Sequence, residues 1–332
     1  MTAHRSPNTP DPKRMAEDLQ PKLRELEQDR LARRKSTFTM AGAMVGVLLA
    51  AGGVASITLE MSMLVTLPLF LAVVLTLLLI SRRQSAWVDH AGSKLIPEIC
   101  KAYGDDIEYQ KAGDKALVKP FNALELIGYW NRGTVKHVLR GEYGGHRFES
   151  GLADLRHHSS GGRKGNSSTR QIFYGFLFRI QLQARIEPGL SIRPNFGWFS
   201  KTFGKRAIPT GNEAFDSVFL ISVDDDSPLD TDQLNRLLTP DWQQALLDLN
   251  EDIGTLPYNQ TRLRAGLKYD TLYLALTMEE EGGQVGRVRT QRRRKFPDVG
   301  HLLAGESSLE DKLAPMIEDV GAFRRVIDRL PE

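Results

Sequence analysis

Two long apolar segments constrain this chain more than any other feature of its sequence. TMAGAMVGVLLAAGGVASIT, residues 39–58, and MLVTLPLFLAVVLTLLLI, residues 63–80, contain no charged side chain. As helices that rise about 1.5 Å per residue they would be about 30 and 27 Å long, close to the hydrocarbon thickness of a bilayer. Only four residues join them. The pattern predicts a transmembrane helical hairpin over residues 39–80; a hairpin buried in a soluble core is the alternative.

The charges around the hairpin predict its orientation. Basic residues lie on its two outer flanks, whereas the joining turn has a single charged residue, Glu60. The flanking residues are Arg30, Arg33, Arg34, Lys35, Arg82 and Arg83. Because positive flanks stay in the cytoplasm, we expect a multi-pass membrane protein with both termini cytoplasmic. Cys100 is the only cysteine, so an intrachain disulfide is excluded, which fits a reducing compartment.

The first apolar segment also suggests how it packs. Gly42, Gly46 and Ala50 form a row of small residues four apart, which allows close helix approach. The second segment is the simplest partner for this row, and a second copy of the chain is the alternative. Neither segment contains an ionisable residue. Since ion paths and proton relays need such residues, we expect an anchor rather than a transporter.

The rest of the chain divides into a short and a long cytosolic part. In residues 1–38, a tail precedes an amphipathic helix over residues 12–35. In residues 81–332, strands cluster in the middle and helices at the edges, without βαβ alternation, which predicts an α+β domain with a mostly antiparallel sheet. The expected elements are helices at 85–103, 231–238, 240–249 and 309–330, a strand at 171–182, a strand at 215–223, and hairpins turning at Gly144-Gly145 and Tyr269-Asp270.

Three segments and a late strand give the chain a family resemblance. They are FYGFLFRI (173–180), TGNEAFDSVFLISVDDD (210–226), LLTPDWQQALLDL (237–249) and LYLAL (272–276). With the apolar hairpin ahead of them, these segments resemble the bacterial membrane-protein family catalogued as domain of unknown function 3137, over most of residues 40–280. The resemblance implies a membrane-anchored cytoplasmic domain. It supplies no catalytic residues, and it does not reach residues 287–295 or the final helix.

Two stretches mix features that suit contact with a membrane surface. The first, NFGWFSKTFGKR, interleaves aromatic and basic side chains; the second, RVRTQRRRKF, is strongly basic. Rings favour headgroup depth, and each basic residue near an anionic leaflet contributes about 1 kcal/mol. Core packing of the aromatics and a solvated loop balanced by nearby glutamates are the alternatives. The candidate contact residues are Trp198, Phe199, Lys201, Lys205, Arg206, Arg292, Arg293, Arg294 and Lys295.

Charge and motifs argue against several function classes. The net charge is +3, and residues 81–332 carry 35 basic and 34 acidic side chains, without the basic excess typical of nucleic-acid binding. Signatures of common hydrolases, kinases and metalloproteases are missing. Four histidines (His137, His146, His157, His158) lie in or beside the first hairpin, but adjacent strand residues face opposite sides, so metal binding is not favoured.

Three consecutive acids, Asp224 to Asp226, follow the strand at 215–223. The spacing of an EF-hand would require glycine and glutamate where Leu229 and Asn235 stand. A strand-to-helix turn with Asp230 near a helix N-terminus is therefore the favoured interpretation, and a metal site the alternative.

These observations lead to one functional expectation. We expect a non-enzymatic inner-membrane protein, without a cofactor, whose cytosolic domain binds a partner protein, a second copy or the anionic membrane surface. A membrane-tethered enzyme or small-ligand sensor, using a pocket beside the sheet, is the alternative.

Overall fold

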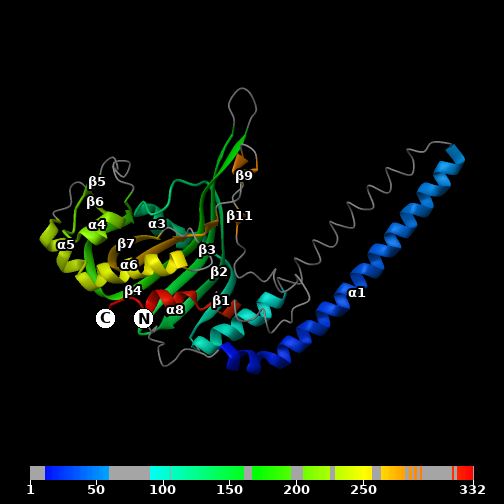
Figure 1. The fold of residues 1–332 in the computed structure, drawn as a ribbon, viewed down its shortest axis with the longest axis horizontal. Helices are drawn as coiled ribbons and strands as arrows, with labels where there is room; N and C mark the ends of the chain where they lie inside the picture. Colours follow the sequence, from blue (N-terminus) through cyan, green and yellow to red (C-terminus); the bar gives the residue numbers. More distant parts are fainter. Residues whose placement is uncertain are drawn as a thin grey trace. The chain divides into compact units, whose positions relative to one another are not determined.

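The computed structural model describes most of the chain (Figure 1). The described residues are 12–59, 90–104, 106–160, 167–195, 205–224, 229–255, 263–280, 284–285, 288–289, 292–293, 316–317 and 320–331. They fall into two compact units. A helical unit comprises residues 10–99 and 297–319, and a sheet unit comprises residues 100–296 with the C-terminal residues 320–332.

The helical unit contains one very long helix, α1 (Pro12–Leu59), of 48 residues. Its first half buries four apolar side chains, Met15, Leu19, Leu23 and Leu26, so the amphipathic helix predicted at residues 12–35 is confirmed. A second helix, residues 90–103, runs through Pro97 and buries Ala91, Leu95, Ile96 and Ile99.

Two ion pairs join these helices. Lys22 Nζ lies 2.8 Å from a carboxylate oxygen of Glu98, and Lys94 Nζ lies 2.8 Å from one of Glu25. The later residue of α1 pairs with the earlier residue of the second helix, so the two helices are antiparallel. An antiparallel pair of this kind is what a helical hairpin requires of the residues before and after it.

The structure describes only the first of the two predicted transmembrane segments. Residues 39–58 lie within α1 and are helical. Residues 63–80 lie outside the described residues. Within the part of the chain that is described, no helix combines the length and apolar character needed to cross a bilayer.

The sheet unit is built on a seven-stranded antiparallel sheet, so the predicted α+β class is confirmed. Its strands are β1 (Glu108–Gly113), β2 (Arg132–Tyr143), β3 (His146–Ser159), β4 (Ser168–Pro194), β5 (Lys205–Ala207), β6 (Phe219–Asp224) and β7 (Leu263–Thr277). The order is β1-β2-β3-β4-β6-β5, and β7 pairs with β4. β4 is central, because its first half pairs with β3, its last residues pair with β6, and β7 covers its opposite edge.

The hairpin predicted at Gly144-Gly145 is confirmed. Tyr143 pairs with His146, and the two glycines between them have φ values of 58° and 77°. Positive φ at both central positions is the geometry of a type I′ turn, whose twist matches that of the flanking strands. The sequence signal was sufficient here because glycine adopts this conformation at little cost.

The main core lies on one face of the sheet. There η1 (Lys115–Val118), α3 (Lys119–Ala123) and the chain after α3 cover the buried side chains of β2, β3, β4 and β7. The ring of Phe121 meets that of Tyr273 edge to face, with centroids 5.4 Å apart. Leu155, Phe173 and Leu177 complete the centre of this core. Apolar residues of α3 and of strands distant in the sequence therefore bury one face of the sheet.

Helices close the rest of the sheet unit. α5 (Thr231–Leu237) and α6 (Pro240–Thr255) confirm the two helices predicted after the acidic cluster. Asp230 caps α5: its carboxylate accepts from Gln233 N at 2.8 Å, while Gln233 Oε1 accepts from Asp230 N at 3.1 Å. α8 (Ala322–Ile327) lies within the predicted C-terminal helix, of which residues 316, 317 and 320 are also helical and residues 328–330 are not. Two-residue strands, β8 (Glu279–Glu280), β9 (Gln284–Val285), β10 (Val288–Arg289) and β11 (Arg292–Arg293), form two small ladders.

Two predicted elements are wrong. The predicted hairpin at Tyr269-Asp270 does not exist, because β7 continues through both residues. Tyr269 has φ of 57°, and the register against β4 shifts on either side of it, so the strand carries an irregularity where a turn was expected. The strand predicted over 215–223 begins only at Phe219. A short helix, α4 (Glu213–Val218), precedes it and is capped by the side chain of Asn212.

Candidate functional site

Few of the residues predicted to contact a membrane surface are described. Trp198, Phe199 and Lys201 lie outside the described residues. Lys205 opens β5, and Arg206 follows it on the same strand. The guanidinium of Arg206 donates to the backbone oxygen of Leu229, so this side chain has a structural contact within the sheet unit.

The basic stretch after Gly286 is also described in part. Arg292 and Arg293 form β11, in which they pair with Glu280 and Glu279 of β8. Arg294 and Lys295 lie outside the described residues. The backbone register sets each of the two arginines opposite a glutamate. The role of this stretch at a membrane remains a prediction.

The small residues of the first apolar segment lie on α1. Gly42 and Gly46 are exposed, and a Cβ atom added at either would meet nothing within 4 Å. Ala50 belongs to the same helix. The two glycines therefore leave room along α1 for another helix to approach closely.

The polar residues of the segment TGNEAFD, residues 210–216, have structural roles. The carboxylate of Asp216 accepts hydrogen bonds from Thr210 N at 3.1 Å, Thr210 Oγ1 at 2.9 Å and Gly211 N at 3.1 Å. Asn212 Nδ2 donates to Gln243 Oε1 at 2.9 Å, which ties the turn to α6. The polar residues of this block are thus used to fix the entry into β6. They point to stability rather than to chemistry.

The acidic cluster lies mostly beyond what the structure describes. Asp224 ends β6, whereas Asp225 and Asp226 lie outside the described residues. Among the described residues, no group of three or more His, Cys, Asp or Glu side chains is placed to hold a metal ion. Asp230, the acid that the sequence analysis placed near a helix N-terminus, is the N-cap of α5.

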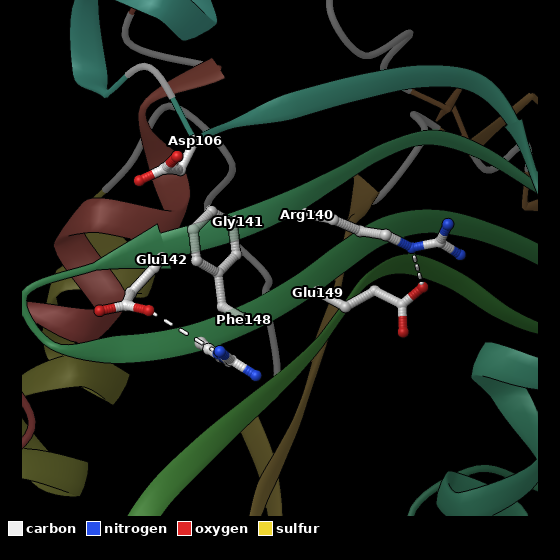
Figure 2. A pocket seen from close by; sticks show the side chains of 7 residues that line it. Asp106, Arg140, Gly141, Glu142, Phe148 and Glu149 are labelled. Carbon is white, nitrogen blue, oxygen red and sulfur yellow. Dashed lines mark hydrogen bonds and ion pairs between the residues drawn. The ribbon is translucent and has the colours of Figure 1, made fainter.

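A charged depression of about 530 Å³ lies at the β2–β3 hairpin (Figure 2). It is lined by Asp106, Arg140, Gly141, Glu142, Arg147, Phe148 and Glu149. In Figure 2 the carboxylates of Asp106 and Glu142 lie toward one side of the Phe148 ring and the Arg140–Glu149 pair toward the other. The strand alternation predicts this division, because Arg140 and Glu149 are directly opposite each other and so share one face of the sheet.

Four of the five charged side chains that line the depression form two ion pairs. Arg140 Nε donates to Glu149 Oε1 at 2.6 Å, and Arg147 Nε lies 3.7 Å from Glu142 Oε2. Two of the three lining carboxylates are therefore held by arginines and do not converge on a common point. The arrangement suits a solvated sheet face better than a site that binds a metal or activates a water.

The Arg140–Glu149 pair is part of a longer row across the sheet. By register, Glu108 is opposite Arg140, Glu149 is opposite Arg179, and Arg179 is opposite Tyr273. Acidic and basic residues thus alternate over β1, β2, β3 and β4. Cross-strand pairs of opposite charge stabilise a sheet by about 0.2–1 kcal/mol each, so this row is a structural feature that the sequence could reveal only once the strand register was known.

The four histidines do not form a cluster. His137 has φ of 51° at an irregularity in β2, and its Nδ1 forms a 2.8 Å hydrogen bond with the hydroxyl of Tyr109. His146 Nδ1 contacts Gln181 O at 3.0 Å. His157 and His158 lie near the end of β3, which extends to Ser159 and pairs there with the start of β4 at Ser168.

The sequence analysis missed an exposed aromatic residue beside these histidines. Tyr129 is 71% exposed, and its ring centroid lies 5.5 Å from that of His157. Its neighbour Trp130 packs against the main core and donates to Asn122 Oδ1 at 3.0 Å. The sequence pair Tyr129-Trp130 gave no periodic signal, so only the structure separates the outward ring from the inward one.

Comparison with known proteins adds little to these observations. No family model matches the chain, and no curated protein matches it. A solved structure, the crystal structure of the mycobacterial trehalose monomycolate transport factor A, TtfA, is similar at 10% sequence identity. The similarity covers 75% of this chain and 95% of that chain, with a TM-score of 0.31. At this TM-score the likeness supports no inference about fold or function.

Proposed function

We propose that this chain is a bacterial inner-membrane protein in which the segments 39–58 and 63–80 anchor a cytosolic α+β domain that acts as a binding module. The observation that carries the proposal is the change of character along α1. Its first half is charged and buries one apolar face, whereas residues 39–58 are uncharged and leave Met40 48% and Val47 69% exposed. A continuous helix with exposed apolar side chains and no charge suits a hydrocarbon environment.

The charges on either side of the anchor support the orientation. The basic residues before residue 39 and after residue 80 favour cytoplasmic flanks. The antiparallel pairing of residues 12–35 with residues 90–99 is the arrangement expected if the chain crosses the membrane and returns. The resemblance to the family of domain of unknown function 3137 gives the same expectation.

The polar groups favour a binding role over catalysis, because most of them are already engaged by other groups of the protein. Two of the three carboxylates of the charged depression pair with arginines, and the carboxylate of Asp216 in the TGNEAFD block accepts the hydrogen bonds that fix a turn. A partner protein, a second copy or the anionic membrane surface are the ligands that such a domain would bind from its place beside the bilayer. Affinity purification of the intact protein in mild detergent identifies a protein partner if one exists.

A matched pair of substitutions on α1 tests the anchor. Val47→Arg places a charge in the uncharged segment, and the cost of an arginine at the centre of a span is about 2.5–3.5 kcal/mol. Leu31→Arg places the same charge at an exposed position, 51% accessible, in the charged half of the same helix. We expect the wild-type protein and Leu31→Arg to stay in membranes after alkaline extraction, and Val47→Arg to be released or degraded.

Two outcomes would contradict this proposal. Release of the wild-type protein by alkaline extraction would remove the anchor. A periplasmic signal from a reporter fused after Glu332 would reverse the orientation, because the proposal places both termini in the cytoplasm.

A further inference from the structure

The paired ends of β3 and β4 project beyond the rest of the seven-stranded sheet (Figure 1). β7 pairs with β4 only from Gly175 onward, and the first residue of β2, Arg132, is opposite Arg156. Past these points, Arg156–Ser159 and 168–171 pair with each other as a two-stranded ribbon. We call these residues, together with 129–132, the ribbon end.

The ribbon end carries an excess of positive charge. Arg132 and Arg170 are exposed, and His157 and His158 are half-buried. Around them, over residues 128–134, 154–160 and 167–174, the only carboxylate is that of Asp154. It is held by both Nε and Nη2 of Arg156, at 3.0 and 2.8 Å. Arg132 and Arg170 are therefore the excess charges.

The residues between β3 and β4 in the sequence also carry net positive charge. Residues 160–167, SGGRKGNS, contain Arg163 and Lys164 and no acid. Close to the base of the ribbon, Met278 N donates to Tyr174 O at 2.8 Å, and β8 begins at the next residue. The register of this small ladder sets two arginines of β11 opposite two glutamates of β8, so these four residues together carry no net charge.

The ribbon end also presents an aromatic ring on a fixed support. Tyr129 is 71% exposed and contacts the imidazole of His157. Next to it, the side chain of Asn131 donates to His158 O at 2.7 Å and accepts from His158 N at 2.8 Å. The hydroxyls of Ser159 and Ser168 lie 2.8 Å apart across the ribbon. These bonds hold the backbone of the ribbon end, so presenting the ring and the charges costs little conformational freedom.

We propose that the ribbon end contacts the anionic headgroups of the bilayer in which the chain is anchored. An exposed tyrosine ring suits the depth of the headgroups, and arginines pair with lipid phosphates. Each basic residue beside an anionic surface strengthens contact by about fivefold. The inference rests on the proposed function, since the anchor keeps the domain within reach of that surface.

A probe on the ribbon end tests the contact in the full-length protein. Ser160→Cys, next to the ribbon end, provides an exposed thiol, whereas Cys100 is fully buried, so an environment-sensitive fluorophore attaches to the introduced position. The labelled protein is reconstituted into nanodiscs of phosphatidylcholine alone or with phosphatidylglycerol, each containing a headgroup-attached quencher. We expect stronger quenching in the anionic discs, and a loss of about fivefold in the contact equilibrium for each of Arg132→Gln and Arg170→Gln.

A charge-matched variant provides the control. Arg147→Gln with Arg179→Gln removes two exposed positive charges elsewhere on the sheet, and we expect it to leave the quenching unchanged. Equal quenching in both kinds of disc would overturn the inference about the ribbon end while leaving the anchor intact. The inference is also overturned if this control loses as much quenching as the double variant Arg132→Gln with Arg170→Gln, or if a single-stranded oligonucleotide shields the probe while lipid composition does not. Failure to enter nanodiscs would instead overturn the anchor, and the contact with it.

Discussion

Phe323 of α8 stacks on Phe148 of β3, with ring centroids 4.5 Å apart and an interplanar angle of 11°. Tyr103 and Tyr143 meet the same ring edge to face, each at 5.6 Å. Phe323 is 1% exposed. One side chain near the C-terminus therefore joins the helix before β1, the β2–β3 hairpin and α8.

We expect Phe323→Ala to destabilise the sheet unit by about 3–5 kcal/mol, because it removes a buried ring and leaves a cavity among three aromatic neighbours. Urea unfolding of the full-length protein in detergent, followed by tryptophan fluorescence, measures the change. Phe323→Leu is the control and should lose much less. An alanine variant as stable as wild type would show that α8 is not held at this position in solution.

Asp216 offers a second test, of the turn that leads into β6. Asp216→Ala leaves the N–H groups of Thr210 and Gly211 without their carboxylate acceptor, and hydrogen bonds to charged groups contribute about 1.5–3 kcal/mol. We expect a loss of that size in the free energy of unfolding. Asp106→Ala, an exposed acid of the same unit, should change it by less than about 0.5 kcal/mol. Similar losses for the two variants would contradict a structural role for the TGNEAFD block.

Close approach of β4 and β7 makes Gly175 hard to replace. A Cβ atom at this position would collide with the backbone carbonyl of Leu276, which cannot move without shifting β7. We expect Gly175→Ala to destabilise the protein by about 1–3 kcal/mol or more. Gly189 lies on the same strand, where an added Cβ would meet the flexible side chain of Lys268 at 3.3 Å and the backbone oxygen of Leu267 at an ordinary contact distance of 3.6 Å. Gly189→Ala is therefore the matched control, and thermal melts of both variants decide the point.

The sequence predicted the elements whose local signals agree with their surroundings. Gly144-Gly145 could only be a tight turn, and the apolar pattern of residues 12–35 could only be one buried helix face. It failed where a local signal competes with packing. Tyr269-Asp270 looks like a turn, but ten residues of β7 are buried, and keeping them against β4 outweighs the strain of φ of 57° at one exposed tyrosine.

Candidate sites were harder to predict than elements, for a physical reason. The ribbon end depends on which residues face each other across β3 and β4, and the row from Glu108 to Arg179 depends on the register of four strands. Neither relationship is local in the sequence. By contrast, the role of Asp230 could be predicted, because an N-cap depends only on its own next three residues.

The ion pair between Glu25 and Lys94 gives the helical unit a testable pH response. The hydrogen bond and charge of Lys94 lower the pKa of Glu25 below its ordinary value of 4.5. A lowered pKa in the folded state means that the pair stabilises the unit above the ordinary value and loses this contribution as the pH falls through the lowered one. NMR titration of the Glu25 carboxyl should show a midpoint that rises in Lys94→Met. A midpoint unchanged by this substitution would mean that the two helices do not pair through these residues.

Burial should make the single thiol of the chain inert. Cys100 is fully buried, and burial raises the pKa of its thiol to about 12. Thiolate is the reactive form, so at pH 8 we expect the folded protein to react with a maleimide more than a hundredfold more slowly than the urea-unfolded chain, since each unit of pKa lowers the thiolate fraction about tenfold. Mass spectrometry of timed aliquots measures both rates, and Ser160→Cys supplies an exposed thiol in the same protein as the control. Rapid labelling of folded wild-type protein would show that the helix over residues 90–103 opens readily.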